Sequence, residues 1–530
     1  MRAESPLARR RPRASRRLRI ALAAAAAAGL VTAGAIAAVA TPHSTPTTAQ
    51  QEQGMTPGAP LAEPAVANAG PDGMEITLDA AKTRFTVSGK DVWGESYAGT
   101  LVAPTLQLQP GATTSITLHN RLPVATNLHF HGLHTSPEGS ADNPFVCIPP
   151  GASYTYRLQI PTSQQQGTFW YHSHAMGTTC PAPMNGSGGH MASMPSSSFS
   201  PGDVENQIFA GLSGALIVGD SRASLPAALR DIPVHTIVLK DVQIDTAGKI
   251  VQNTTATSID SNADTVRLVN GQLKPVLSMR PGETQLWRFA NVGADIFYRL
   301  QLDGYRFTVL AEDGNEYPAA AEAAELLVPP GKRFDVLVTA GAAKGTTALR
   351  TLAYSNGPQG DSYPDAELMK VDVSGTSAAA APLPAGAALA GAPGDLTSSA
   401  VAQHRTLALS EDASGTAFYI NGRQFSMDQS TFGLAAKLGT VEEWTILNSA
   451  GEDHPFHMHT NAFQVMSVNG TAPAFPHRLD TVVVPHAVNG VPGKVVIRQA
   501  FADYPGKWMF HCHIAAHEDN GMMGYIQVVA

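Results

Sequence analysis

The feature that most restricts the fold of this 530-residue chain is a pair of landmarks that recurs three times in the same order. The first is a glycine nine positions before an asparagine, in PGATTSITLHN, PGETQLWRFAN and LGTVEEWTILN. The second is a Pro-Gly pair that opens another strand-like run, at Pro150-Gly151, Pro330-Gly331 and Pro492-Gly493. One Pro-Gly turn before a strand is common and carries little weight. Two landmarks in a fixed order in three blocks indicate three similar domains.

The runs between these turns alternate in polarity or are β-branched, and helical periodicity is poor, so we predict an all-β fold of sandwiches. The predicted domains cover residues 71–222, 223–375 and 395–530. Residues 376–394 are rich in Ala, Pro and Gly and predict an interdomain linker. A stretch at 178–201, rich in Ser, Gly, Pro and Met, predicts a loop insertion.

The N-terminal residues 1–40 predict an export signal rather than a folded element. Ser15-Arg16-Arg17-Leu18 is a twin-arginine pattern, an uncharged apolar run follows, and Ala38-Val39-Ala40 fits a cleavage site. Arg19 stands where such signals often have an aromatic residue, so Sec export stays open. An uncleaved membrane anchor is the other alternative, because the apolar run is nearly long enough to span a bilayer. Residues 41–70 predict a disordered spacer, and we expect a periplasmic, cell-envelope or secreted protein.

Charge and cysteine content exclude two classes of protein. The net charge is −8 and the sequence pI is near 6.1, which gives a nucleic-acid partner no electrostatic support. Three cysteines in an exported chain of this length do not make a disulfide scaffold. Cys147 and Cys180 have the option of pairing, which the sequence does not decide, and the odd count leaves at least one thiol for another purpose.

Four His-x-His pairs stand out: His129 and His131, His172 and His174, His457 and His459, and His511 and His513. Residues two apart on a strand point to the same face, so each pair presents two imidazoles side by side. Imidazole is a favoured copper ligand, and eight from two repeats suit a cluster of metal ions. The matching places in the middle repeat read GADIFYRL and TTALRTL, without histidine. We therefore expect a structural or substrate-access role for the middle domain.

The HCH run adds a second kind of site. Strand alternation sends Cys512 to the opposite face from its two histidine neighbours. His454, His517 and Met522 lie in the neighbouring motifs, and a cysteine with two histidines and a weak axial methionine is the blue-copper electron-transfer set. Zinc also accepts cysteine and histidine, but it has no redox chemistry and does not require a thioether.

The motifs HFHG, WYHSH, HPFHMH and HCHIAAHEDNGMM resemble the four copper-binding motifs of three-domain multicopper oxidases, the group of laccases and bacterial copper-tolerance oxidases. The resemblance spans essentially the whole mature chain. It implies three cupredoxin-like Greek-key β-sandwich domains and four copper ions. It implies a type 1 copper bound by His454, Cys512, His517 and Met522. It assigns the type 2 copper to His129 and His457, one type 3 copper to His131, His172 and His513, and the other to His174, His459 and His511.

The resemblance also implies an activity, the one-electron oxidation of phenols or aromatic amines coupled to the four-electron reduction of O2 to water. Electrons would enter at the type 1 copper and pass from Cys512 to its two histidine neighbours. Asp142, in ADNPFVC, and Glu518 resemble acids that supply protons to the O2 site. The alternative for each is a hydrogen-bond acceptor that orients a ligand histidine.

Two other functions compete with this one. A metallo-oxidase for Cu(I) would use thioethers, and Met176, Met184, Met191 and Met194 lie with His190 in or beside the loop insertion. Incidental methionines in a loop are the simpler interpretation of that stretch. A copper-binding electron carrier would need only the type 1 set and would leave three His-x-His pairs without a purpose. We expect a monomer with O2 and a small reducing substrate as its partners, and no membrane contact apart from an uncleaved N-terminal anchor.

Overall fold

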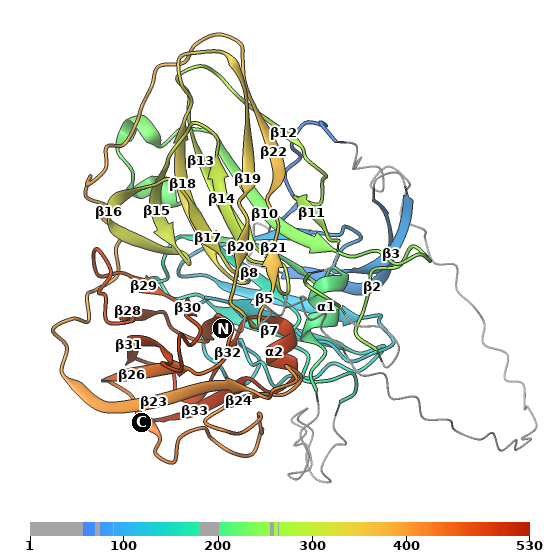
Figure 1. Ribbon diagram of the computed structural model, residues 1–530, viewed down its shortest axis with the longest axis vertical. Helices are drawn as coiled ribbons and strands as arrows, with labels where there is room; N and C mark the ends of the chain where they lie inside the picture. Colours follow the sequence, from blue (N-terminus) through green and yellow to red (C-terminus); the bar gives the residue numbers. More distant parts are fainter. Residues whose placement is uncertain (1–56, 69–74, 88–89, 181–200, 255–258, 263) are drawn as a thin grey trace, which may run out of the picture. The chain divides into compact units, whose positions relative to one another are not determined.

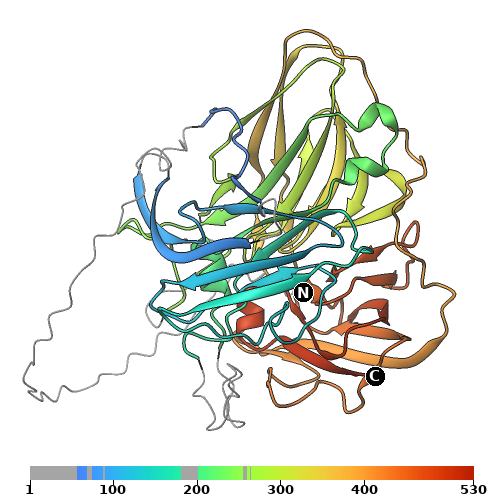
Figure 2. The same ribbon diagram turned by 180° about the vertical axis from the view of Figure 1, so that it is seen from behind.

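The computed structural model describes residues 57–68, 75–87, 90–180, 201–254, 259–262 and 264–530. The predicted export signal lies outside the described residues. So does most of the loop insertion, with its residues Met184, His190, Met191 and Met194. The strands fall into three groups along the chain, blue to cyan, green to yellow and orange to red, which both views separate (Figures 1 and 2).

The first repeat forms a five-stranded sheet, ordered β1-β4-β9-β8-β6, and a four-stranded sheet, ordered β3-β2-β5-β7. Alternate residues of its strands are buried, as in β5, so the apolar side chains of the two sheets meet in one core. Its elements are β1 (Val66–Asn68), β2 (Glu75–Val87), β3 (Lys90–Ser96), β4 (Ala103–Leu108), β5 (Thr113–Asn120), β6 (His129–His131), β7 (Ser153–Gln159), β8 (Gly167–His172), α1 (Val204–Ala210) and β9 (Ser213–Val218).

The middle repeat forms a six-stranded sheet, ordered β11-β10-β13-β18-β15-β16, and a five-stranded sheet, ordered β12-β22-β19-β14-β17. Its elements are the 3-10 turns η2 (Ser221–Ser224) and η3 (Ala227–Leu229) and the strands β10 (Val234–Val242), β11 (Val266–Val269), β12 (Val276–Met279), β13 (Thr284–Asn291), β14 (Tyr298–Leu302), β15 (Phe307–Glu312), β16 (Asn315–Ala323), β17 (Leu326–Val328), β18 (Arg333–Thr339), β19 (Gly345–Thr351), β20 (Tyr354–Ser355), β21 (Ser362–Tyr363) and β22 (Ala366–Val373).

The third repeat forms a six-stranded sheet, ordered β24-β23-β26-β31-β28-β29, and a five-stranded sheet, ordered β25-β33-β32-β27-β30. Its elements are β23 (Val401–Glu411), β24 (Phe418–Ile420), β25 (Ala436–Lys437), β26 (Thr440–Asn448), β27 (His454–Met458), β28 (Phe463–Val468), β29 (Arg478–Leu479), β30 (Thr481–Val484), β31 (Gly493–Phe501), β32 (Gly506–Cys512), α2 (Ala515–Asp519) and β33 (Met523–Val529).

The three repeats share one pattern of strand pairing. The strand after the first landmark runs parallel to an earlier strand in β2–β5, β10–β13 and β23–β26. It runs antiparallel to the strand after the second landmark in β5–β7, β13–β18 and β26–β31. The second sheet of each repeat contains an equivalent antiparallel pair, which is β6–β8 in the first repeat, β14–β19 in the middle repeat and β27–β32 in the third. This confirms the predicted all-β class, and it places β14 and β19 where the other repeats carry histidines.

The asparagine of the first landmark has the same contacts in each repeat. In the third repeat, Nδ2 of Asn448 donates to the carbonyl oxygens of Glu452 and Val484 at 2.8 and 3.1 Å. Its Oδ1 accepts the N–H of Ala450 at 2.9 Å. The equivalent side chains, Asn120 and Asn291, make the corresponding three bonds. Each asparagine therefore satisfies three backbone groups where its strand ends, which explains its place in the repeat.

The predicted disordered spacer, residues 41–70, is wrong for the part that the structure describes, residues 57–68. Strand β1 pairs in parallel with β4 of the first repeat. Before it, the N–H of Leu61 donates to the carbonyl oxygen of Val276 in the middle repeat at 2.8 Å. The segment has no apolar period of its own, but its extended backbone pairs with sheet edges that would otherwise be open.

The remaining connections also have fixed places. Residues 376–394, all of which the structure describes, form no strand, and they are hydrogen-bonded to β16 through Gly386, Ala387 and Ala320. A disulfide joins Cys147 to Cys180, which settles the pairing that the sequence left open, and Cys512 is free and buried. Among the residues in the described ranges, no helix has the length and hydropathy needed to cross a membrane.

Candidate metal centre

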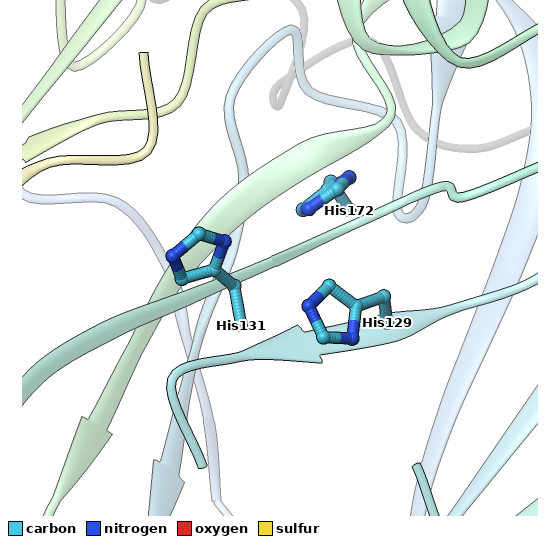
Figure 3. A group of neighbouring side chains, drawn as sticks. All are labelled: His129, His131 and His172. Carbon is cyan, nitrogen blue, oxygen red and sulfur yellow. The ribbon is translucent and has the colours of Figure 1, made fainter. Parts of the chain in front are cut away.

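The four His-x-His pairs meet in one buried cluster. In the first repeat His129 lies opposite His172 across the pair β6–β8, and in the third repeat His457 lies opposite His511 across β27–β32. The rings of His129 and His131 point to the same side of β6, toward His172 (Figure 3). The two repeats then face each other, because the ring of His129 stacks on that of His459 with centroids 3.8 Å apart. All eight rings are at most 2% exposed.

The ring nitrogens gather at the spacing that a metal ion needs. One nitrogen each from His174, His459 and His511 lies within 4.8 Å of the others, and this group is one of the two type 3 sets predicted. The other five histidines are interleaved rather than divided into separate sites. His129 shares a group with His131 and His172, and a second group with His457 and His459. How these five rings are divided between two metal ions remains a prediction.

The cysteine site lies on the other face of β32. Sγ of Cys512 is 3.6 Å from Nδ1 of His454 and 3.6 Å from Nδ1 of His517, and all three side chains are buried. Met522 is fully buried beside them. Its N–H donates to the His517 carbonyl at 2.9 Å, and its own carbonyl accepts the N–H of Cys512 at 3.0 Å. The structure therefore brings together the side chains of three residues predicted for the type 1 site, and Met522 adjoins them through its backbone. The role of Met522 as axial ligand stays a prediction.

The hydrogen-bonding state of the rings fits a metal. Nε2 of His129, His172 and His457 has no hydrogen-bond partner among the described residues, although each ring is buried. Burial lowers the pKa of all three rings, so they are neutral and keep a lone pair. A buried nitrogen without a partner is costly, and a bound cation supplies that partner. Neutral imidazole nitrogens without a hydrogen-bond partner are a donor set that copper accepts.

Asp142 holds the first of these rings. Its Oδ1 lies 3.0 Å from Nδ1 of His129 and accepts the N–H of Phe130 at 3.0 Å. Burial raises the pKa of Asp142 to about 8, against the lowering effect of the Phe130 N–H. This contact leaves Nε2 of His129 directed into the cluster.

Glu518 lies between two rings of the group that contains His174 and His511. Its Oε1 is 3.2 Å from Nε2 of His174, and its Oε2 is 3.0 Å from Nδ1 of His511. Burial by itself raises the pKa of Glu518, but His511 and His174 outweigh it and lower the pKa to about 2. Both predicted acids therefore touch ligand candidates.

Two carboxylates in contact with the centre are absent from the sequence prediction. Oδ1 of Asp480 lies 3.0 Å from Nε2 of His131, and its backbone oxygen lies 2.8 Å from Nδ1 of His457. No histidine adjoins Asp480 in RLDTVVVP, so the sequence carried no local signal. Oε1 of Glu452 lies 3.1 Å from Nε2 of His517. Its place two residues before HPFHMH was a signal that the sequence prediction did not use.

Comparison with known proteins assigns the chain to a family. Three family models, each described as multicopper oxidase, match residues 79–192, 234–367 and 397–530. The chain belongs to the multicopper oxidase family. The three matches correspond in order to the three repeats. The predicted family, fold class and enzyme class are thereby confirmed.

Full-length relatives agree with the family models. The multicopper oxidase mco of Staphylococcus haemolyticus is 27% identical over 450 residues, 82% of this chain and 83% of that protein. Multicopper oxidase MmcO of Mycobacterium tuberculosis is 27% identical and covers 93% of this chain and 94% of its own. Among solved structures, a Campylobacter jejuni multicopper oxidase described as a metallo-oxidase superposes with a TM-score of 0.72. It is 24% identical, covers 89% of this chain and 95% of its own, and is evidence for the fold.

Membership fixes the general chemistry. The protein is an oxidoreductase that uses copper, and its partners are O2 and a reducing substrate. Relatives carry the names laccase, from Bacillus subtilis, and iron transport multicopper oxidase, from Gibberella zeae. The activity is that of a laccase or of a metallo-oxidase.

Proposed function

We propose that the protein is a four-copper oxidase that couples four one-electron oxidations of phenols or aromatic amines to the reduction of one O2 to water. The observation that carries this proposal is the position of Cys512 between His511 and His513. Along β32 and the residue directly after it, a thiol site on one face adjoins an eight-histidine cluster on the other. Copper bound at these sites would take up single electrons and reduce O2 with four of them.

The proposed ligands follow the predicted assignment. His454, Cys512, His517 and Met522 would hold the type 1 copper. The other three coppers would be held by His129 and His457, by His131, His172 and His513, and by His174, His459 and His511. The third of these sets is supported by the mutual closeness of its nitrogens, within 4.8 Å. The first set is supported by the unpartnered Nε2 atoms of His129 and His457, and the second by the unpartnered Nε2 of His172 and Nδ1 of His513.

The chain's own residues have separable roles in this function. His517 is the most exposed proposed ligand, at 7% against at most 2% for the others, so substrate would meet the protein at its ring. Phe418 stacks on this ring with centroids 4.0 Å apart and limits its movement. Asp142 and Glu518, in contact with the histidine rings, would hold and pass the protons that O2 reduction consumes.

Carboxylates beside His517 favour a second candidate substrate, a low-valent metal ion such as Cu(I). Glu452 contacts the ring directly. Burial and the nearby carboxylates of Glu411, Asp361 and Asp453 raise the pKa of Glu452 to about 9. Glu452 therefore holds its proton at neutral pH, and the attraction for cations would come from the carboxylates around it, Glu411, Asp361 and Asp453. Such a group of acids favours metal ions or cationic arylamines over neutral phenols.

Copper analysis of the purified protein tests the proposed cofactor set, because the proposal requires four copper ions per chain. One or two per chain would contradict it. A steady-state comparison of Cu(I) with a dimethoxyphenol then ranks the two substrates. Deleting residues 181–200, which keeps Cys180 for its disulfide, should slow only the Cu(I) reaction if the Met-rich segment recruits that ion.

We also propose that the chain is exported as a monomer by the twin-arginine route. The disulfide between Cys147 and Cys180 supports export, because such bonds persist in oxidising compartments. Cleavage after Ala40 would give a mature N-terminus at Thr41, which sequencing of the exported protein checks. Replacing Arg16 and Arg17 by lysine should retain the protein in the cytoplasm, and unchanged export would contradict the route.

A further inference from the structure

The middle repeat reaches the histidine cluster although β14 and β19 carry no histidine. Its Pro-Gly landmark lies in the loop between β17 and β18, and Gly331 has φ +82°. A Cβ added there would lie 2.9 Å from Cδ2 of His513 and 3.1 Å from Cε1 of His131. The backbone of the middle repeat therefore packs directly on one ring from each of the other two repeats.

Arg333, the first residue of β18, adds charged contacts from the middle repeat to the other two repeats. Its Nη1 and Nη2 donate to Oδ1 and Oδ2 of Asp480 at 2.8 and 2.6 Å, which makes a bidentate ion pair. Its Nε donates to the carbonyl of Thr168 at 3.2 Å, on the strand β8 that ends at His172. The side chains of Arg333 and Asp480 are 0% and 2% exposed. One buried guanidinium thus joins all three repeats.

Asp480 in turn forms hydrogen bonds with two histidine rings of the cluster. Its Oδ1 accepts from Nε2 of His131 at 3.0 Å, and its backbone oxygen accepts from Nδ1 of His457 at 2.8 Å. These bonds leave Nδ1 of His131 and Nε2 of His457 to face the cluster. Nδ1 of His131 indeed lies 3.2 Å from Nε2 of His513. The hydrogen bond made by one ring nitrogen decides which nitrogen is left for a metal.

The glycine of the HFHG motif makes room for this ion pair. Gly132 has φ +86°, and a Cβ there would lie 2.5 Å from Oδ2 of Asp480 and 2.6 Å from Nη2 of Arg333. Lys332, also of the middle repeat, contacts the residue after Asp480. Its Nζ donates to the carbonyl of Thr481, the first residue of β30, at 2.5 Å. Two consecutive cations of the middle repeat therefore anchor the segment that contains Asp480.

We propose that Arg333 is a positioning residue of the O2-reducing centre, which acts through Asp480 to fix the orientation of His131 and His457. The inference rests on the proposed function, in which these two rings belong to a type 3 and the type 2 copper. It replaces the expectation that the middle domain has only a structural or substrate-access role. The middle repeat orients ligands that the other two repeats supply.

The test compares Arg333→Lys with Arg405→Lys in the copper-loaded enzyme. Arg405 forms a similar bidentate buried pair with Glu442, at 2.6 and 2.8 Å. Among the described residues its other hydrogen bonds go to the carbonyls of Leu434 and Ala435, away from the eight histidines. Lysine keeps the charge but loses the planar fork. We expect Arg333→Lys to bind type 2 copper about 10- to 100-fold more weakly and to shift its EPR signal, as changes in partners of ligand residues do. The blue absorption from the Cys512 site should be unchanged, and Arg405→Lys should retain both signals.

A double variant, Arg333→Met with Asp480→Leu, separates positioning from stability. It removes both charges of the pair, and Asp313, which also contacts Arg333, keeps its ion pair with Lys332. Replacements that remove a whole buried pair are commonly tolerated. We expect it to unfold near the wild-type temperature as metal-free protein, yet to show the weakened type 2 site. Wild-type copper affinity and EPR signal in Arg333→Lys would overturn the inference, also where the double variant, which lacks Asp480 as well, shows a weakened type 2 site. Fewer than four coppers in the wild type would instead contradict the proposed function.

Discussion

Sγ of Cys512 lies 3.6 Å from Nδ1 of His517 on one face of β32. The rings of its chain neighbours, His511 and His513, lie in the histidine cluster on the other face. This arrangement requires nothing beyond the two-residue alternation of a strand. Peptide bonds therefore join Cys512 directly to two residues of the buried histidine cluster.

Replacing Cys512 by serine tests that connection. Serine has a similar shape but no thiolate, so we expect loss of the blue absorption and of substrate oxidation. The eight histidines are untouched, so three coppers per chain should remain, and the thermal unfolding temperature should change little. Metal analysis and the visible spectrum measure this outcome. Substrate oxidation by the serine variant would contradict the proposed electron path.

The sequence was sufficient for the features that depend on short-range order. The period of two predicted the paired imidazoles and the opposed face of Cys512. The landmarks at Asn120, Asn291 and Asn448 revealed three domains, because each asparagine satisfies backbone groups where its strand ends. Such local requirements leave a readable pattern in a single chain.

Contacts between repeats left no such pattern. Arg333 and Asp480 are separated by 147 positions and meet only when the middle and third repeats pack together. Each alone looks like an ordinary charged residue beside a strand. The segment 57–68 was predicted wrongly for the same reason, since its order comes from sheet edges in two other parts of the chain.

Gly331→Ala should damage both stability and the metal centre. Its φ of +82° disfavours a side chain, and the new Cβ would displace the rings of His513 and His131. Gly151→Ala is the matched control, because Gly151 is the equivalent landmark of the first repeat, has φ +78° and has open space around its added Cβ. We expect both to lose about 1–3 kcal/mol from backbone strain. Only Gly331→Ala should also lower copper content, and equal copper content in the two variants would argue against close packing there.

Asn291→Ala should destabilise the middle repeat by at least about 2 kcal/mol, since buried backbone groups lose their partners. Nδ2 of Asn291 donates to the carbonyls of Ile296 and Val328 at 2.8 and 2.9 Å, and water has no access to this fully buried site. Asn461→Ala removes one part-buried hydrogen bond, to Ala500, and should cost about 1 kcal/mol or less. Denaturant unfolding followed by fluorescence compares them. Similar midpoints would mean that the landmark asparagine is dispensable.

A buried carboxyl away from the metal centre predicts a pH-dependent loss of stability. Glu95, on β3, is 5% exposed, and its Oε2 has no hydrogen-bond partner among the described residues. Burial, reinforced by Asp203 and opposed by Lys82, raises the pKa of Glu95 from 4.5 to about 7. The folded state therefore holds this proton more tightly than the unfolded state. Its contribution to stability is present below pH 4.5 and is lost as the pH rises toward 7.

Glu95→Gln replaces the ionisable group by a neutral one of the same shape, so the variant should lack this loss. Above pH 7 we expect it to be more stable than the wild type by up to about 3 kcal/mol, the free energy of a pKa shift of this size. Near pH 4.5 the two proteins should be similar. Urea midpoints of the metal-free proteins between pH 4.5 and 8.5 measure the difference, with Glu75→Gln, at an exposed carboxylate, as the control. A constant difference across this range would show that ionisation of Glu95 does not oppose folding.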